Sequence, residues 1–198
     1  MISHLKFFEG LRFATLCLML LASAQVAAIE DPRGLVMRTS QELVDLLVKN
    51  RQEIKKTPDI AFKLADQTVI PNVDFVKISQ WVLGKYWREA NSEQKKHFVA
   101  AFQRFIVNTY VTAMVTYTDE IIRESKNVSY PDNKTKIDND KALVASVIQL
   151  NSGQRVEVGY RLYLSNNGWK IYDVVIEGIS LAIKIGRASC RERVLRRV

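Results

Sequence analysis

The sequence is poor in the side chains that build metal sites and disulfides. It holds two cysteines and two histidines in 198 residues, and Cys17 and Cys190 lie near opposite ends. Between residues 29 and 183 there is no cysteine, and His97 is the only histidine. A zinc site needs several nitrogen or sulfur ligands, so we expect no metal here. A domain without disulfides must rely on its apolar core.

Motifs of the common hydrolases and nucleotide-binding enzymes are also missing. No G-x-S-x-G segment and no glycine-rich phosphate loop occurs among the 8 glycines. His97 sits in a polar turn, where a solvated surface histidine is favoured over a general base. The carboxylates of Asp138 and Asp140 fit turn chemistry. We therefore expect no enzyme activity, no catalytic residue and no cofactor.

Most of the positive charge lies at the two ends. The net charge is +8, and residues 184–198 contribute six basic residues against Glu192. Residues 1–28 add a small basic excess, so residues 29–183 are close to neutral. A nearly neutral domain has few cations with which to neutralise phosphates. We expect no nucleic-acid binding.

Residues 1–28 have the pattern of a secretory signal peptide. Lys6 and Arg12 give a basic start, and residues 13–21 form an apolar run too short for a stable anchor. Cleavage is possible after Ala24 or after Ala28, and we prefer the second site. The prediction is an exported protein. An uncleaved anchor is the alternative.

Residues 184–198 lose all apolar periodicity. This stretch resembles the translation of a sequencing adapter joined in frame to a truncated gene, so we interpret it as a non-native tail. The alternative is a genuine basic tail that contacts nucleic acid or anionic lipid.

Between these ends, the first half of the chain is predicted to be helical. One helix begins at Asp31-Pro32 and continues to about Lys56, and a shorter helix follows Thr57-Pro58. A third begins after the N-cap Asp74 and ends at Gly84. A fourth begins with the capping box of residues 91–94 and is predicted to run to Glu124.

After Lys126 the period of the apolar residues changes from 3.6 to 2. Strands are predicted at residues 142–150, 155–165 and 169–176, separated by turns rich in Asn, Asp, Ser and Gly. No linker or repeat divides the region, so we expect one domain. Helices followed by an antiparallel meander indicate an α+β fold, with the helices over the apolar face of the sheet.

Two blocks of residues carry a family resemblance. The first contains Pro71, Val73-Asp74-Phe75, Gly84, Trp87, Ala90, Gln94, Phe98 and Phe102; the second contains residues 169–173 and 177–180. At these spacings they resemble the MlaC family, the toluene-tolerance auxiliary component of ABC transport. The resemblance covers residues 31–183.

The resemblance implies a fold and a function. Its fold is a set of N-terminal helices on a twisted antiparallel sheet, with a lipid cavity between them. Its function is that of a periplasmic phospholipid shuttle in a Gram-negative bacterium, which maintains the lipid asymmetry of the outer membrane. The implied partners are an outer-membrane lipoprotein–porin complex and an inner-membrane ABC transporter with MCE-type subunits. We expect a monomer with phospholipid as cargo. Family members continue with further helical sequence, so the domain of residues 29–183 is predicted to be truncated at its C-terminus.

Apolar and aromatic side chains that face inward are the candidate cavity lining. They are Val73, Phe75, Ile78, Val82, Phe98, Phe102 and Tyr110 from the helices, and Val158, Tyr160, Leu162, Val174 and Ile176 from the strands. Periodicity alone fits an ordinary packed core equally well, and it is the resemblance that favours a cavity. Lys85, Arg88, Arg104 and Arg161 are candidate headgroup contacts at the rim, with solvated surface charges as the alternative.

A diacyl lipid sets the size of the cavity. Its roughly 30 methylenes would cost on the order of 25 kcal/mol to expose to water, so both tails need enclosing. This predicts a pocket near the upper end, roughly 1,000 Å³, of the usual range. The alternative function is a periplasmic interaction module with a solid core and no lipid. A hydrolase is the weakest interpretation.

Overall fold

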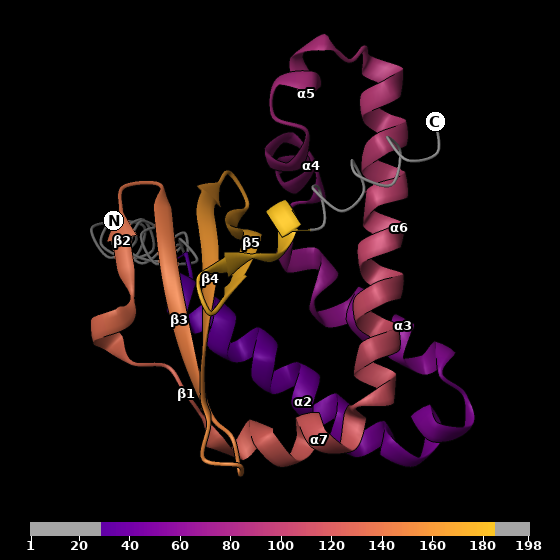
Figure 1. Ribbon diagram of the computed structural model, residues 1–198, viewed down its shortest axis with the longest axis vertical. Coiled ribbons are helices and arrows are strands. Elements are labelled where there is room, and N and C mark those ends of the chain that lie inside the picture. The colour runs from indigo at the N-terminus through magenta and orange to yellow at the C-terminus, as the bar shows by residue number, and fades with distance from the viewer. Residues whose placement is uncertain (1–28, 185–198) are drawn as a thin grey trace, which may run out of the picture.

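The computed structural model describes residues 29–184. The predicted signal peptide and all but the first residue of the predicted tail therefore lie outside the described residues. Helices occupy the first part of the described chain and an antiparallel sheet the second. This confirms the α+β prediction. The sheet lies on one side of the molecule and the long helix α6 on the other (Figure 1).

Two helices begin the fold at the positions that the sequence predicts. Helix α2 spans Pro32–Lys56, and the Asp31 side chain caps it by accepting from the backbone N–H of Arg33 and Gly34. Helix α3 spans Asp59–Thr68. Pro58 lies directly before α3. Proline is well suited to a helix start, because the N–H groups of the first turn have no partner within the helix and the one that proline lacks is not missed.

A short 3-10 turn (η1, Ile70–Asn72) leads into α4 (Phe75–Leu83) and α5 (Lys85–Glu89). Asp74 caps α4 by accepting from the backbone N–H of Lys77 at 2.8 Å. Gly84 separates the two helices with φ +53°, in the left-handed region that favours glycine. The Asp74 N–H also donates to the Ile171 carbonyl at 2.9 Å, which fixes the start of α4 to the sheet.

Helix α6 (Ser92–Thr116) begins with a complete capping box. The Asn91 side chain accepts from the Gln94 N–H, and the Gln94 side chain accepts from the Asn91 N–H, both at 2.9 Å. We expect Asn91→Ala to lower the free energy of unfolding by about 1 kcal/mol, because the Gln94 N–H loses its acceptor at the helix end. Urea denaturation followed by circular dichroism measures this. A loss no larger than that of the exposed substitution Lys96→Ala would contradict it.

The prediction that this helix continues to Glu124 is wrong. Helix α6 ends at Thr116, and a separate helix α7 (Thr118–Glu124) runs across its end (Figure 1). The Thr118 hydroxyl donates to the carbonyls of Met114 and Val115. A hydroxyl that bonds to the preceding turn competes with the helix ladder, and the chain changes direction there.

The second half forms a sheet in the order β1-β3-β4-β5-β6, with β2 also paired to β3. The strands are β1 (Val128–Ser129), β2 (Lys136–Asp138), β3 (Lys141–Gln149), β4 (Arg155–Ser165), β5 (Gly168–Ile176) and β6 (Ile179–Ser180). All pairings along this path are antiparallel. The three long strands match the sequence prediction to within one residue at each end. The three short ones were not predicted.

The apolar interior divides into three clusters. The first joins α2 to the sheet through Leu35, Val36, Val144, Leu162 and Ile171. The second lies among α2, α3 and α6 around Leu47, Ile54 and Val111, and the third joins α4 and α6 through Phe75, Ile78 and Phe102. Helix α2 thus covers β3 and β4, whereas α6 packs mainly against α3 and α4. Members of all three clusters, among them Ile171, Val111 and Ile78, border the space between α6 and β5.

Candidate functional site

A cavity of about 400 Å³ lies between α6 and β5. Nearly all of the side chains that line it are apolar. The lining residues are Leu43, Ala65, Val69, Ile70, Val73, Phe75, Ile78, Ile106, Val107, Tyr110, Val111, Met114, Ile171, Asp173, Val174, Ile176, Leu181 and Ala182. They come from both halves of the chain, so the site exists only once helices and sheet are assembled.

One wall of the cavity is helix α6. Ile106, Val107, Tyr110, Val111 and Met114 recur at helical spacing along its inner side. By length and composition α6 would also suffice to cross a bilayer. Those two properties do not distinguish a membrane span from a helix that lines an apolar cavity, and α6 lines one.

The opposite wall is strand β5. Ile171, Val174 and Ile176 line the cavity from this strand. A β-bulge against β4 falls between Arg161 and Leu162, so that Tyr172 has no partner opposite it. Bulges re-aim the side chains that follow them, and this one sets how Val174 and Ile176 face the helices.

Asp173 is the one acidic residue of the lining. Its side chain is fully buried, and one carboxylate oxygen accepts from Arg161 Nη1 at 3.0 Å. The other accepts from the Ser180 hydroxyl at 2.8 Å and more weakly from the Ala182 N–H at 3.5 Å. These bonds satisfy the carboxylate and hold Leu181 and Ala182 against the end of the cavity. Asp173 therefore has a structural role, since it connects Arg161 on β4 with Ser180 on β6.

Tyr110 marks the place where the cavity meets solvent, since it lines the cavity and is 40% exposed. Burial of its ring side raises the pKa of the Tyr110 phenol above its ordinary value. Burial likewise raises the pKa of the Tyr160 phenol, which packs against the cluster between α2 and the sheet. Both hydroxyls therefore stay neutral at physiological pH, and neither adds charge to the apolar region.

Six of the twelve predicted lining residues lie on this cavity: Val73, Phe75, Ile78, Tyr110, Val174 and Ile176. The other six lie elsewhere in the interior. Val82, Phe98 and Phe102 pack in the α4–α6 cluster, where the two phenylalanine rings stack with centroids 5.5 Å apart. Leu162 and Tyr160 belong to the cluster under α2, and Val158 is buried on β4 beside Ile176.

Much of the α6 wall was not predicted from the sequence. Ile106, Val107 and Val111 were absent from the predicted lining, as were Ile171, Asp173, Leu181 and Ala182. Ile106 lies four residues after Phe102, so helical spacing could have identified it. No such signal marks Leu181 and Ala182, because their position depends on the hydrogen bonds to Asp173.

Three of the four predicted rim cations are exposed on helices. Lys85 and Arg88 lie on α5, and Arg104 lies on α6. Arg161 lies instead in a separate hollow on the sheet face that points away from α2, with Leu143, Gly159 and Val175. It is bound to Asp173 and does not line the apolar cavity.

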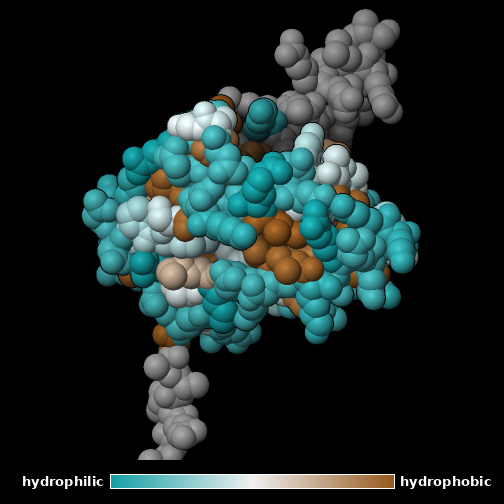
Figure 2. All heavy atoms as spheres, turned by 90° about the horizontal axis from the view of Figure 1, so that it is seen from below, coloured by the Kyte–Doolittle hydropathy of each residue, from teal (hydrophilic) through white to brown (hydrophobic). Residues whose placement is uncertain are grey.

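The face of the molecule at the α7 end is mostly hydrophilic (Figure 2). Seen from the end that carries α7, hydrophilic residues cover most of the area, and hydrophobic residues gather in one patch near the centre (Figure 2). His97 is exposed on α6. Within residues 29–184, no three His, Cys, Asp or Glu side chains cluster closely enough to hold a metal ion.

Comparison with known proteins identifies the family. The model of the MlaC protein family matches residues 37–186. This chain belongs to the MlaC family. The resemblance predicted from the two sequence blocks is thereby confirmed.

Two relatives of established name are similar over most of the chain. The toluene tolerance protein Ttg2D of Pseudomonas putida is 27% identical over 155 residues, which cover 78% of this chain and 69% of the relative. The intermembrane phospholipid transport system binding protein MlaC of Haemophilus influenzae is 24% identical over 178 residues, covering 89% and 80% respectively.

A solved structure has the same fold. The phospholipid-binding protein of Ralstonia solanacearum, determined in complex with a phospholipid, superimposes with a TM-score of 0.67 at 25% identity. The match covers 84% of this chain and 89% of that protein. A member of this fold class thus holds a phospholipid.

Proposed function

We propose that this protein is a periplasmic phospholipid carrier. The observation that supports it best is the apolar cavity between α6 and β5, whose single charged lining residue, Asp173, is already paired. Such a wall suits acyl chains, which have no polar groups to satisfy. The names of the MlaC-family relatives and the phospholipid bound to the Ralstonia protein support the same cargo.

The lipid binds through its tails, with its headgroup outside. An ionised headgroup buried without partners would cost far more than it gains, and the cavity wall offers it no free partner. Tyr110, at the edge of the cavity, is where we place the glycerol region. Arg104, six residues before Tyr110 on α6, is then a candidate headgroup contact. The other two candidates, Lys85 and Arg88, lie farther from Tyr110, on α5 beside the start of α6. Arg161 is the least suited because Asp173 engages it.

The cavity is smaller than the cargo that we propose. Its volume of about 400 Å³ lies toward the lower end of ligand pockets, whereas two tails were expected to need roughly 1,000 Å³. We therefore propose that α6 and the sheet move apart when lipid enters. Because α6 packs mainly against α3 and α4, it can shift without breaking the α2–sheet cluster.

In the full proposal the carrier moves phospholipid between two membrane complexes. The two complexes are an outer-membrane lipoprotein–porin complex and an inner-membrane ABC transporter with MCE-type subunits, and the result is the maintenance of outer-membrane asymmetry. Transfer proceeds by binding and release, with no enzymatic step and no cofactor. A monomer is sufficient for this task, since the cavity is built within one chain.

Native mass spectrometry of the exported protein, purified without detergent, tests the proposed cargo. We expect one phospholipid per monomer, because the tails cannot leave the cavity for water at a useful rate. Gentle collisional activation should release a single lipid mass. A folded but empty protein would contradict the carrier and favour an interaction module with no lipid.

A further inference from the structure

The outer surface of α4 and α5 combines apolar and aromatic side chains with cations. Val76 and Trp81 are each 47% exposed, and Tyr86 is 55% exposed. Tyr86 borders an open hollow between α5 and the start of α6. We define the aromatic–basic patch as Val76, Lys77, Trp81, Lys85, Tyr86 and Arg88. Isolated exposed apolar residues are common, but a group of them among cations points to a binding surface.

Contacts with aromatic rings position two of the cations. The Lys77 ammonium lies 4.1 Å from the centre of the Tyr163 ring, and the Lys85 ammonium lies 5.1 Å from that of Tyr86. Trp81 rests edge-on against Tyr172, with centroids 6.3 Å apart. The α4 part of the patch therefore packs against the sheet, and the charges of Lys77 and Lys85 lie beside aromatic rings.

We propose that the aromatic–basic patch docks on the anionic surface of a phospholipid bilayer. Tryptophan and tyrosine prefer the headgroup level of a membrane, where one end of the ring is wet and the other apolar. Lysine and arginine are attracted to anionic lipids within a Debye length of the surface. Within α4 and α5 only Glu89 is acidic, against three cations. The charge and the aromatic content thus complement the same surface.

One further carboxylate, that of Asp74, lies next to the patch and is engaged within the fold. Asp74 precedes α4, and its oxygens accept from the Lys77 N–H and from the Tyr163 hydroxyl. The hydrogen bond to Asp74 raises the pKa of Tyr163 to about 12, so the phenol stays protonated and this contact persists at neutral pH.

Helix α4 connects the patch to the cavity. Phe75 and Ile78 line the cavity from the inner side of the helix, while Val76 and Trp81 lie on its exposed side. A helix is about 10–12 Å across, so a membrane docked on the patch lies one helix away from the site. Docking through α4 would bring the cavity close to the lipid that it takes up or delivers. The purpose of the docking rests on the proposed function, but the docking itself is a separate property.

Vesicle flotation tests the inference with the exported full-length protein. We expect it to float with vesicles of phosphatidylethanolamine and phosphatidylglycerol at low salt, and not with vesicles of phosphatidylcholine. At 1 M salt, where the Debye length is about 3 Å, it should be released. Three cations and two rings give weak binding, which suits a carrier that must leave the membrane again.

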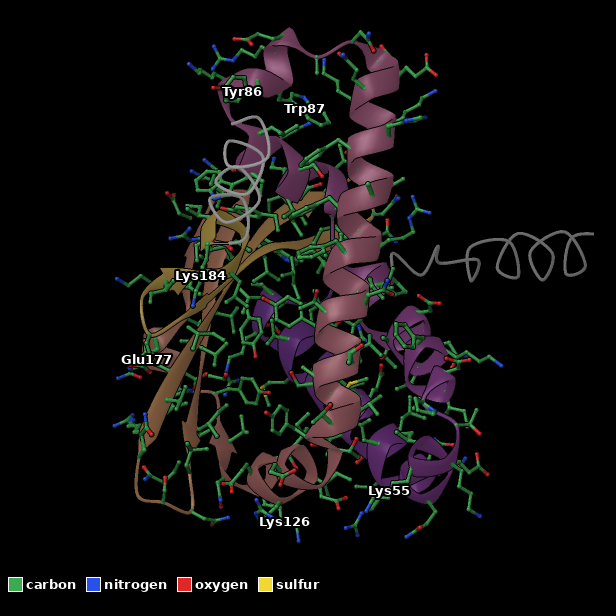
Figure 3. All side chains as sticks on the ribbon, turned by 45° about the vertical axis from the view of Figure 1, so that its right-hand side comes forward. Lys55, Tyr86, Trp87, Lys126, Glu177 and Lys184 are labelled. Carbon is green, nitrogen blue, oxygen red and sulfur yellow. The ribbon has the colours of Figure 1, made fainter. Side chains whose placement is uncertain are left out.

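Two matched substitutions locate the surface. Lys85→Glu should lower the fraction bound to anionic vesicles at least tenfold, whereas Lys126→Glu should leave it within about twofold. Lys126 is exposed at the opposite end of the molecule (Figure 3), and both changes alter the net charge equally. Tyr86→Ala, which touches no charge, should weaken binding about threefold. The basic residues beyond 184 are present in every variant and affect all of them alike.

Each outcome decides the inference. No flotation at low salt, or equal losses for Lys85→Glu and Lys126→Glu, would overturn the bilayer contact at this patch. Flotation that is largely lost with Lys85→Glu, weakened with Tyr86→Ala and retained with Lys126→Glu supports it. Native mass spectrometry of the same samples separates this from the carrier proposal: a protein that holds lipid but ignores vesicles overturns only the docking, and an empty protein that floats overturns only the cargo.

Discussion

Replacing Val174 by glutamate should abolish lipid loading while leaving the fold largely intact. Val174 lines the cavity from near the C-terminal end of β5 and is only partly buried, so the carboxylate of the variant can remain hydrated as long as no lipid is bound. Acyl chains that enter must strip this water, at a cost of about 3 kcal/mol or more. That penalty is about two orders of magnitude in affinity. Native mass spectrometry should show an empty protein, and circular dichroism an unchanged helical signal.

Val175→Glu is the matched control. Val175 is the next residue on the same strand, but it lines the hollow on the other face of the sheet with Leu143 and Gly159. Successive strand residues point to opposite faces, so this carboxylate lies away from the cavity. We expect normal lipid loading. If both variants lose lipid equally, the effect is one of folding, and if Val174→Glu still carries one lipid per chain, β5 is not the cavity wall that holds the tails.

Replacing Arg161 by alanine should destabilise the protein by about 3 kcal/mol. The substitution leaves the Asp173 carboxylate fully buried with only Ser180 and the weaker Ala182 N–H as donors. Removing one partner of a buried ion pair typically costs 3–5 kcal/mol, and the partial exposure of Arg161 puts this pair at the lower end. For a domain of this size the melting temperature should fall by about 6–12 °C. Differential scanning calorimetry measures both.

Two further variants give this prediction its controls. Arg38→Ala removes an exposed ion pair with Glu30 and Glu42, so it should cost less than about 1 kcal/mol. The double variant Arg161→Ala/Asp173→Ala also removes the unpaired carboxylate. Its loss in the free energy of unfolding should therefore be smaller than the sum of the losses of the two single variants. Equal losses for Arg38→Ala and Arg161→Ala would show that Asp173 is not effectively buried in solution.

The local structure could be predicted from the sequence because its signals act over a few residues. Asp31, Asp74 and the box of Asn91 and Gln94 fixed the helix starts through hydrogen bonds to nearby N–H groups. Gly84 and Gly168 adopt positive φ at the predicted turns. The break at Tyr117 was missed, because it depends on the Thr118 hydroxyl, which bonds to carbonyls of the preceding helix α6, and the apolar period of the sequence continues across it.

The candidate site was only half predictable, for a different reason. On β4 and β5 the same alternation marks every inward residue, so Leu162 and Val174 look alike in sequence. Helix α2 covers Leu162, which is completely buried, whereas the cavity faces Val174. Which helix covers which strand depends on packing between distant segments, and periodicity records only that a side chain faces inward.

By itself, the sequence determined the order of helices and strands, their caps and turns, the apolar faces and the resemblance to the MlaC family. Each of these depends on spacing along the chain. Only the tertiary structure decided that the interior contains a cavity and that α6 forms the wall opposite the sheet. It also decided that Arg161 pairs with Asp173 on the sheet and does not lie at the rim of the cavity. These features depend on distances between residues far apart in sequence, such as the 3.0 Å from Arg161 to Asp173, and on a bulge that shifts the register of β5. Spacing along the chain contains no measure of such distances.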